Sequence, residues 1–269
     1  MNFQNITAVS VLSLIGLSAH GASTVTYDFD SEGAGDFFDG GVSGWTQSPN
    51  NQSAFGQIFP MAYIAEADFG NGISMAGHLG THRGNTPDNT ATTVSGTLNF
   101  LGVPAAPQVT LNLGILDGAA DSFESRDSFT VALKSGDATT LAQINFAPTV
   151  GNTATWDVAV GIGGVTQDTG SKIATNGGYL FNINFGTNTE FWAGGAQGGA
   201  PQLLADVGFV DFSDLATIDL THTPDPGSDP GASAHVLIFD NIVAASVPEP
   251  SGVALLLLGS AFLMGRRRS

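Results

Sequence analysis

Apolar and polar residues alternate over several short stretches of this chain. The alternating stretches are 24–29, 97–101, 109–113, 127–133, 141–146, 155–160, 179–185 and 235–243. A period of two places successive side chains on opposite faces of a strand, so each stretch predicts a half-buried antiparallel strand. No window has the 3.6-residue period of an amphipathic helix. The pattern therefore predicts an all-β protein.

Glycine-rich groups separate many of these stretches and predict tight turns. They are Gly136-Asp137, Gly151-Asn152, Gly163-Gly164 and Asn176-Gly177-Gly178. Two longer segments are predicted loops: 33–56, and 223–231, where three prolines remove backbone donors. Many short strands joined by such turns predict an antiparallel β-sandwich of jelly-roll type. No sharp change in composition divides residues 22–246, which we expect to form one domain.

The charge balance narrows the range of partners. The 269 residues include 24 acidic and 7 basic side chains, for a net charge of −17. Three of the bases, Arg266, Arg267 and Arg268, stand together at the end of the chain. A body this acidic repels phosphate backbones, which excludes nucleic acid as a partner. The chain has no cysteine, which excludes disulfides, thiolate zinc sites and thiol catalysis.

The N-terminal segment has the pattern of an export signal. An apolar run at 9–17 is followed by the small residues Ala19 and Gly21, so we expect signal peptidase to release a mature chain that begins at Ala22. Residues 1–7 contain no Lys or Arg, although signal peptides usually begin with positive charge. The alternative is that residues 1–21 form a buried strand or helix.

The C-terminal segment, 247–269, consists of three parts in a fixed order. Pro248-Glu249-Pro250 comes first, an apolar stretch at 252–265 follows, and the three arginines come last. The apolar stretch would be about 21 Å long as a helix, at ~1.5 Å per residue. That is shorter than the ~30 Å hydrocarbon core of a bilayer, so it is a marginal span. The arginines would hold its end on the cytoplasmic side.

This order of motif, short apolar helix and arginine cluster closely resembles the PEP-CTERM sorting signal. The resemblance implies that the helix anchors the exported protein transiently in the inner membrane. It also implies that an exosortase recognises Pro248, Glu249 and Pro250 and removes the tail, as in other anchors cleaved after export. The product would then reach the cell surface or an extracellular polysaccharide matrix. The alternatives are a plain C-terminal anchor and a buried apolar helix with a basic end.

Two parts of the body resemble carbohydrate-binding jelly rolls of the galactose-binding-like kind. The motifs are Tyr27-Asp28-Phe29-Asp30 and Ser43-Gly44-Trp45 near the beginning, and Ile238-Phe239-Asp240-Asn241-Ile242-Val243 near the end. The resemblance implies that the first and last strands are neighbours. It also implies that Asp28 or Asp30 binds a structural Ca²⁺ together with Asp240. Asn241 stands where those modules often have a second acid, which lowers the expected affinity for calcium.

A second acidic segment is another candidate for Ca²⁺. Residues 117–127 contain several carboxylates that can supply oxygen ligands, but their spacing is not that of an EF-hand. The alternative is a solvated acidic loop.

The chain has no strong catalytic motif, and we assign no catalytic residue. Glu66 and Asp68 share one face of a strand and resemble part of the Glu-x-Asp-x-x-Glu motif of laminarinase-type glycosidases. Asn71 stands in the third position, so one required carboxyl is missing.

The spacing of the histidines is equally weak evidence for a catalytic or metal site. His78 and His82 lie among glycines and are expected in a polar loop, with a metal site as the alternative. His222 and His235 flank the proline-rich segment and have no evident partner in the sequence.

Four aromatic side chains are candidates to stack on sugar rings: Trp45, Trp156, Tyr179 and Trp192. Trp156 stands in an alternating stretch and is expected in the core. Trp45 and Trp192 lie in glycine-rich segments and are the candidate ligand-binding residues. The sequence thus predicts an exported, non-enzymatic β-sandwich at the cell surface or in an exopolysaccharide matrix. The alternative is a secreted hydrolase that acts on polysaccharide.

Overall fold

The structure is a computed structural model of the chain. It describes residues 24–34, 38, 42, 44–48, 60–69, 73–81, 91–98, 107–117, 126–195, 200–225 and 235–246. The predicted signal peptide at 1–21 and the predicted sorting signal at 247–269 lie outside these residues. In the part of the chain that the structure describes, no helix is long and apolar enough to cross a membrane.

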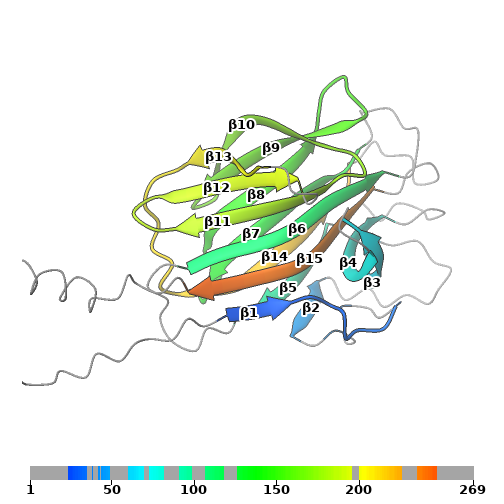
Figure 1. Ribbon diagram of the computed structural model, residues 1–269, viewed down its shortest axis with the longest axis horizontal. Helices are drawn as coiled ribbons and strands as arrows, with labels where there is room; N and C mark the ends of the chain where they lie inside the picture. The colour runs from blue at the N-terminus through cyan, green and yellow to red at the C-terminus, as the bar shows by residue number, and fades with distance from the viewer. Residues whose placement is uncertain are drawn as a thin grey trace, which may run out of the picture. The chain divides into compact units, whose positions relative to one another are not determined.

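The described residues form strands that belong to two antiparallel sheets (Figure 1). Sheet A consists of β1 (Thr24–Tyr27), β3 (Pro60–Asp68), β4 (Ile73–Thr81), β6 (Pro107–Asp117), β11 (Gly178–Phe185), β12 (Thr189–Gly195), β13 (Gln202–Asp206) and β15 (His235–Ser246). Sheet B consists of β2 (Trp45–Ser48), β5 (Thr92–Thr97), β7 (Ser128–Ser135), β8 (Thr140–Pro148), β9 (Thr155–Ile162), β10 (Val165–Ala174) and β14 (Leu215–Thr223).

Some strands that are consecutive in sequence are paired in one sheet, as β7 to β10 are, whereas others lie in different sheets. Sheet A has the order β13-β12-β11-β6-β15-β4-β3, with β1 also paired to β15, and sheet B has the order β10-β9-β8-β7-β14-β5-β2. Among the described strands, the chain passes from one sheet to the other between β1 and β2, β2 and β3, β4 and β5, β5 and β6, β6 and β7, β10 and β11, β13 and β14, and β14 and β15. The inner faces of the two sheets are apolar and bury a common core. The predicted antiparallel sandwich of jelly-roll type is confirmed.

Most of the predicted strands and turns are present. The four glycine-rich turns connect β7 to β8, β8 to β9, β9 to β10 and β10 to β11. Of the predicted strand at 97–101, Thr97 is the last residue of β5 and Leu98 lies outside it, while residues 99–101 lie outside the described residues. The segment TTVSGT of β5 does alternate in burial, but its small polar residues give almost no hydrophobic signal. The predicted loop at 33–56 contains β2, which is short enough to escape a periodicity argument.

An aromatic cluster fills the core near β1 and β2. The rings of Phe29, Phe38, Trp45 and Phe239 lie with their centroids between 5.5 and 5.9 Å apart. Two glycines make room for these rings. A Cβ on Gly96 would lie 2.9 Å from the Trp45 indole, and one on Gly77 would lie 2.3 Å from the Phe239 ring. Glycine is therefore required at both positions by packing rather than by backbone conformation.

A buried carboxylate holds both ends of the proline-rich connection between β14 and β15. The Asp127 Oδ2 atom lies 2.8 Å from His222 Nε2, near the end of β14, and Oδ1 accepts a hydrogen bond of 2.9 Å from the Asp225 backbone N–H. At the start of β15, His235 Nδ1 lies 3.6 Å from Asp127 Oδ2. Asp127, His222 and His235 are all buried. We call this cluster the Asp127 latch.

The Asp127 latch makes the stability of the fold depend on pH. Burial raises the pKa of Asp127, but the hydrogen bonds with His222 and Asp225, together with the nearby His235 ring, hold it well below its ordinary value. The carboxylate therefore stays ionised to a lower pH in the folded protein than in the unfolded chain. Its contribution to stability is complete above the ordinary pKa of Asp and is lost as the pH falls below it.

We expect the Asp127→Asn variant to lose about 1.5–3 kcal/mol of unfolding free energy at pH 7, the range for hydrogen bonds to a charged group. The loss should shrink as the pH falls from 5 to 3, because Asp127 takes up a proton in the unfolded wild type over this range while the folded carboxylate stays ionised, so the wild type loses stability there and the asparagine variant does not. Urea unfolding of the full chain in mild detergent, followed by tryptophan fluorescence at each pH, measures both effects. Asp214→Asn, at an exposed aspartate, is the matched control. Equal losses at pH 7 and pH 3 would contradict the role given to the Asp127 charge.

Candidate functional site

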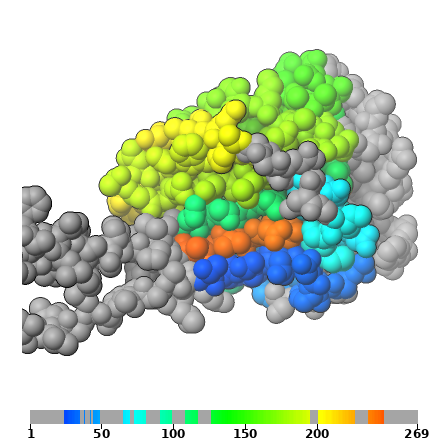
Figure 2. All heavy atoms as spheres, viewed as in Figure 1, coloured from blue at the N-terminus to red at the C-terminus, as the bar shows by residue number. Residues whose placement is uncertain are grey.

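The outer face of sheet A is a polar surface with one tryptophan. In β6 and β11 the side chains that point inward are apolar, whereas those that point outward are mostly amides and hydroxyls. Strand register aligns the outward positions in rows across β6, β11, β12 and β13. The residues of this surface, which we call the amide face, are Gln108, Thr110, Asn112, Leu180, Asn182, Asn184, Glu190, Trp192 and Leu203. Figure 2 looks onto this side of the sheet.

Hydrogen bonds order the side chains of the amide face. Gln108 Nε2 donates to Asn182 Oδ1 at 3.1 Å and to Asn184 Oδ1 at 2.9 Å. This arrangement commits both asparagine carbonyl oxygens and leaves their NH₂ groups as donors to a ligand. One column along the sheet, Trp192 Nε1 donates to Glu190 Oε2 at 3.0 Å, which fixes the indole on the sheet.

Trp192 is half-buried and has apolar neighbours on two sides. Leu203 pairs with Trp192 across β12 and β13, and Leu180 lies diagonally from it on β11. Both leucines are unusually exposed, at 49% for Leu203 and 40% for Leu180. The indole and the leucines therefore form an apolar strip beside the ordered amides. Trp192 remains a candidate ligand-binding residue.

Trp45 is not on this surface, and its prediction as a ligand-binding residue is wrong. Its side chain is only 5% exposed and packs against Tyr27, Phe29, Phe38 and Phe239 in the core. The glycine-rich sequence around it indicates a surface loop, but the flat space above Gly96 takes up the indole. The prediction that Trp156 belongs to the core is confirmed, because it is fully buried.

The first and last strands are neighbours, as the sequence resemblance implies. β1 pairs with β15 from Thr24 opposite Ala245 to Tyr27 opposite Ile242. Asp28 and Asp30 follow β1 directly, and both are exposed. Asp240 lies where β15 changes its partner from β4 to β1, at a register shift next to Asn241, whose φ is +49°. We call these three aspartates the carboxylate junction.

Asp240 is a buried carboxyl group with like charges nearby. Its Oδ2 accepts hydrogen bonds from Ser74 Oγ at 2.8 Å and from Asn241 Nδ2 at 3.0 Å, and its Oδ1 accepts one from the Asn241 backbone at 2.7 Å. Burial raises the pKa of Asp240 to about 6, against the effect of these hydrogen bonds, and the charges of Asp30 and Asp28 also raise it. Among the described residues, no three His, Asp or Glu side chains are gathered closely enough to hold a metal ion.

The acidic segment 117–127 and the histidines His78 and His82 were the other candidate metal sites, and their described residues differ from what the sequence predicts. Of the segment 117–127, residues 118–125 lie outside the described residues, and Asp127 belongs to the buried latch rather than to a solvated loop. His78 lies on β4 and is 5% exposed, so the prediction of a loop histidine is wrong; His82 lies outside the described residues.

The pair Glu66 and Asp68 behaves as its spacing predicts. Both side chains are exposed on the same face of β3, and Asn71 lies outside the described residues.

The partners of His222 and His235 could not be found in the sequence. Asp127 is separated from them by 95 and 108 residues, so no local pattern connects the three. The amide face was missed for the same reason, apart from Trp192. The local signal for a polar surface there is the alternation of polar and apolar residues in 109–113 and 179–185.

Comparison with known proteins finds likeness in fold but not in sequence. No protein-family model matches the chain, and no curated protein matches it at a significant level. The chain is similar to the CBM2 module of the evolved Dit of Lactobacillus casei BL23 phage J-1, at 13% identity and a TM-score of 0.49, over 84% of this chain and 96% of that one.

Two further solved structures are similar at the same level. The lectin UEA-II, in complex with galactose, has 6% identity and a TM-score of 0.49, over 84% of this chain and 99% of that one. The carbohydrate esterase vb_24B_21 from the Shiga toxin-encoding bacteriophage phi24B has 15% identity and a TM-score of 0.45, over 84% and 99%. At such identities, the function has to be inferred from the side chains of this chain.

Proposed function

We propose that this protein is an exported, non-enzymatic β-sandwich that binds a neutral polysaccharide through its amide face. The observation that carries the proposal is the apolar strip around Trp192 next to the ordered row of Gln108, Asn182 and Asn184. Indole faces pack against the C–H surface of a pyranose ring, while amide groups exchange hydrogen bonds with its hydroxyls. A flat sheet face can contact several successive sugars of a chain.

Charge supports a neutral rather than an acidic glycan. The chain carries a net charge of −17, and the amide face itself holds Glu190, with Asp206 opposite it on β13. An anionic polysaccharide would meet repulsion over this whole surface. A neutral chain of sugars would meet donors, acceptors and apolar strips without that cost.

The alternative of a polysaccharide hydrolase centres on the same two acids. Glu190 and Asp206 are cross-strand neighbours, and retaining hydrolysis uses two carboxyls about 5–5.5 Å apart. Both groups are engaged: Glu190 accepts from the Trp192 indole, and Asp206 accepts from Asn188 Nδ2 at 2.8 Å. We therefore favour binding over hydrolysis.

The route to the surface follows from the two end segments. We propose that signal peptidase removes residues 1–21 and that the protein crosses the inner membrane, where the apolar tail holds it. An exosortase then recognises Pro248, Glu249 and Pro250 and releases it to the cell surface or the exopolysaccharide matrix. The order of proline motif, apolar helix and arginines supports this proposal.

We further propose that the carboxylate junction takes up Ca²⁺. Its donors are oxygens, which suit this ion, and a cation would offset the cost that burial and two neighbouring acids impose on the ionised form of Asp240. Asp28 and Asp30 are exposed, so their side chains can turn toward Asp240. The calcium would tie β1 to β15 and stabilise the edge of sheet A; it would take no part in chemistry.

Replacing Trp192 with alanine should weaken retention on insoluble neutral glycans about tenfold, which corresponds to ~1.4 kcal/mol of lost stacking. The full chain in mild detergent is applied to a panel of insoluble polysaccharides, and the bound fraction is titrated. Phe209→Ala, which removes an aromatic ring that is 69% exposed but lies off the strands, is the control and should bind as the wild type does. Equal retention of both variants would contradict the amide face, and release of reducing ends would favour the hydrolase.

Calcium should raise the melting temperature, whereas magnesium at the same ionic strength should not. A ligand that binds only the folded state adds ~2.7 kcal/mol at a hundredfold excess over its dissociation constant. Asp240→Asn should abolish the difference between calcium and chelator, and Asp214→Asn should leave it unchanged. The same melting temperature with calcium, magnesium and chelator would refute a calcium site; a calcium shift that survives Asp240→Asn would place it elsewhere.

Replacing both Pro248 and Glu249 with alanine should leave export intact but keep the protein in the membrane fraction. The retained species should have a mass that includes residues 252–269, because the recognition segment outside the apolar helix is lost. Mass spectrometry of the membrane and released fractions measures both points. Release of the double variant at the wild-type rate would refute recognition by an exosortase.

A further inference from the structure

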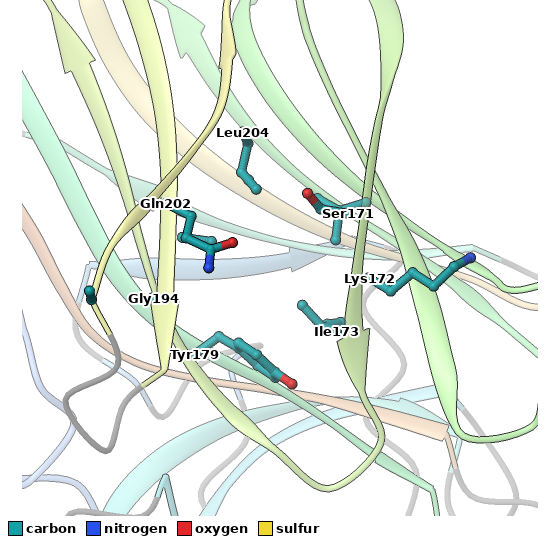
Figure 3. A pocket seen from close by; sticks show the side chains of 10 residues that line it. Ser171, Lys172, Ile173, Tyr179, Gly194, Gln202 and Leu204 are labelled. Carbon is teal, nitrogen blue, oxygen red and sulfur yellow. The ribbon is translucent and has the colours of Figure 1, made fainter.

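A cleft of about 310 Å³ opens between the edge of sheet A at β13 and the edge of sheet B at β10 (Figure 3). It lies between β9 and β10 of sheet B and β11 to β13 of sheet A. Its apolar lining comes from both sheets, and polar groups stand among it. The residues that line it include Val158, Ser171, Ile173, Tyr179, Ala193, Gln202 and Leu204.

The cleft exists because small residues occupy inner positions at this end of the sandwich. Along β11 and β12 the inner positions further into the core are large, as at Phe181 and Phe191, and both are fully buried. At the cleft the next inner position of β12 is Ala193, and β10 presents Ser171 opposite. Among the described strands, β10 and β13 are the last of their sheets, and none of the others closes the gap between them.

One wall of the cleft is an aromatic ring held in place. The Tyr179 hydroxyl accepts a hydrogen bond of 2.8 Å from the Ala174 backbone N–H, across the turn between β10 and β11. A Cβ on Gly177 would lie 2.9 Å from the same ring, so the glycine leaves room for this position. The ring is therefore oriented before any ligand arrives, which lowers the entropic cost of binding.

The polar groups of the cleft are neutral. Figure 3 shows the amide of Gln202 directed into the cleft and the side chain of Lys172 directed away from it. The ammonium group of Lys172 pairs with Asp157. Ser171 and Gln202 thus supply hydrogen-bonding groups without charge, above an apolar floor of Val158, Ile173 and Leu204.

We propose that this cleft is a second binding site, for one or two neutral pyranose units. Its volume is at the lower end of the range for small-molecule sites, which suits a short saccharide rather than a long chain. An aromatic wall, an apolar floor and uncharged hydrogen-bonding groups match a ring that has C–H faces and a hydroxyl rim. The site deepens the proposed function and rests on it.

The cleft and the amide face lie on opposite sides of the same strands. Ala193 and Gln202 form a cross-strand pair that faces the cleft, whereas the adjacent pair, Trp192 and Leu203, faces outward. The amide face would contact the length of a polysaccharide, and the cleft would take a chain end or a short branch. Each surface can therefore be tested without altering the other.

The test is a titration of the full chain, in mild detergent, with glucose, galactose, mannose and their β-linked disaccharides. Isothermal calorimetry should detect binding of at least one of these sugars to the wild type. Gln202→Ala removes a hydrogen-bonding group, and Ala193→Phe fills the cleft; each should weaken that binding tenfold or more. Gln167→Ala, at an exposed glutamine of β10 outside the cleft, is the matched control and should bind as the wild type does.

Two results of this titration would overturn the saccharide cleft. Wild-type affinity in the Gln202→Ala variant, or binding of an apolar dye but of no sugar, would overturn the saccharide cleft. Because Gln202 is exposed, that variant is expected to fold, and its melting temperature checks this. Retention on insoluble polysaccharide reports the amide face separately, so loss of one site and loss of the other are distinguishable.

Discussion

Sheet A depends on β15, because three other strands pair with it. β6 runs along one side from His235 to Ser246, while the other side is shared by β4 and then β1. On that side the pairing with β4 ends at Phe239 and the pairing with β1 begins at Ile242. Between them Asn241 has a φ of +49°, and the ladder with β6 on the other side shifts its register at the same place. The carboxylate junction lies at this point. The first residue of β15, His235, belongs to the Asp127 latch, which connects this strand to sheet B.

Two buried aspartates show how surroundings decide the state of a carboxyl group. Asp127 and Asp240 are each 1% exposed, and burial raises the pKa of both. Around Asp127, two histidines and a backbone N–H more than offset burial, so its pKa falls. Around Asp240, a serine and Asn241 donate, but Asp28 and Asp30 add negative charge, and the pKa rises to about 6. The first group is suited to hold the fold, and the second to attract a cation.

The alternation of side chains along β12 and β13 produces two surfaces from few residues. Odd and even positions face opposite sides of a sheet, so Trp192 and Ala193 belong to different environments although they are adjacent in sequence. At the open end of the sandwich both sides of these strands remain accessible. The net charge of −17 is the reason that uncharged ligands are proposed for both surfaces.

The sequence by itself determined the class of the fold, because alternation and glycine turns are local properties that survive in strands such as 155–160 and 179–185. The export and sorting signals are also linear patterns, and they remain predictions here. Only the tertiary structure decided which tryptophan is exposed: Trp45 and Trp192 have similar glycine-rich neighbours, but Gly96 and Phe239 enclose the first. The Asp127 latch, the carboxylate junction and the cleft each join residues far apart in the chain, and strand pairing, which no local pattern specifies, is the physical reason that they meet.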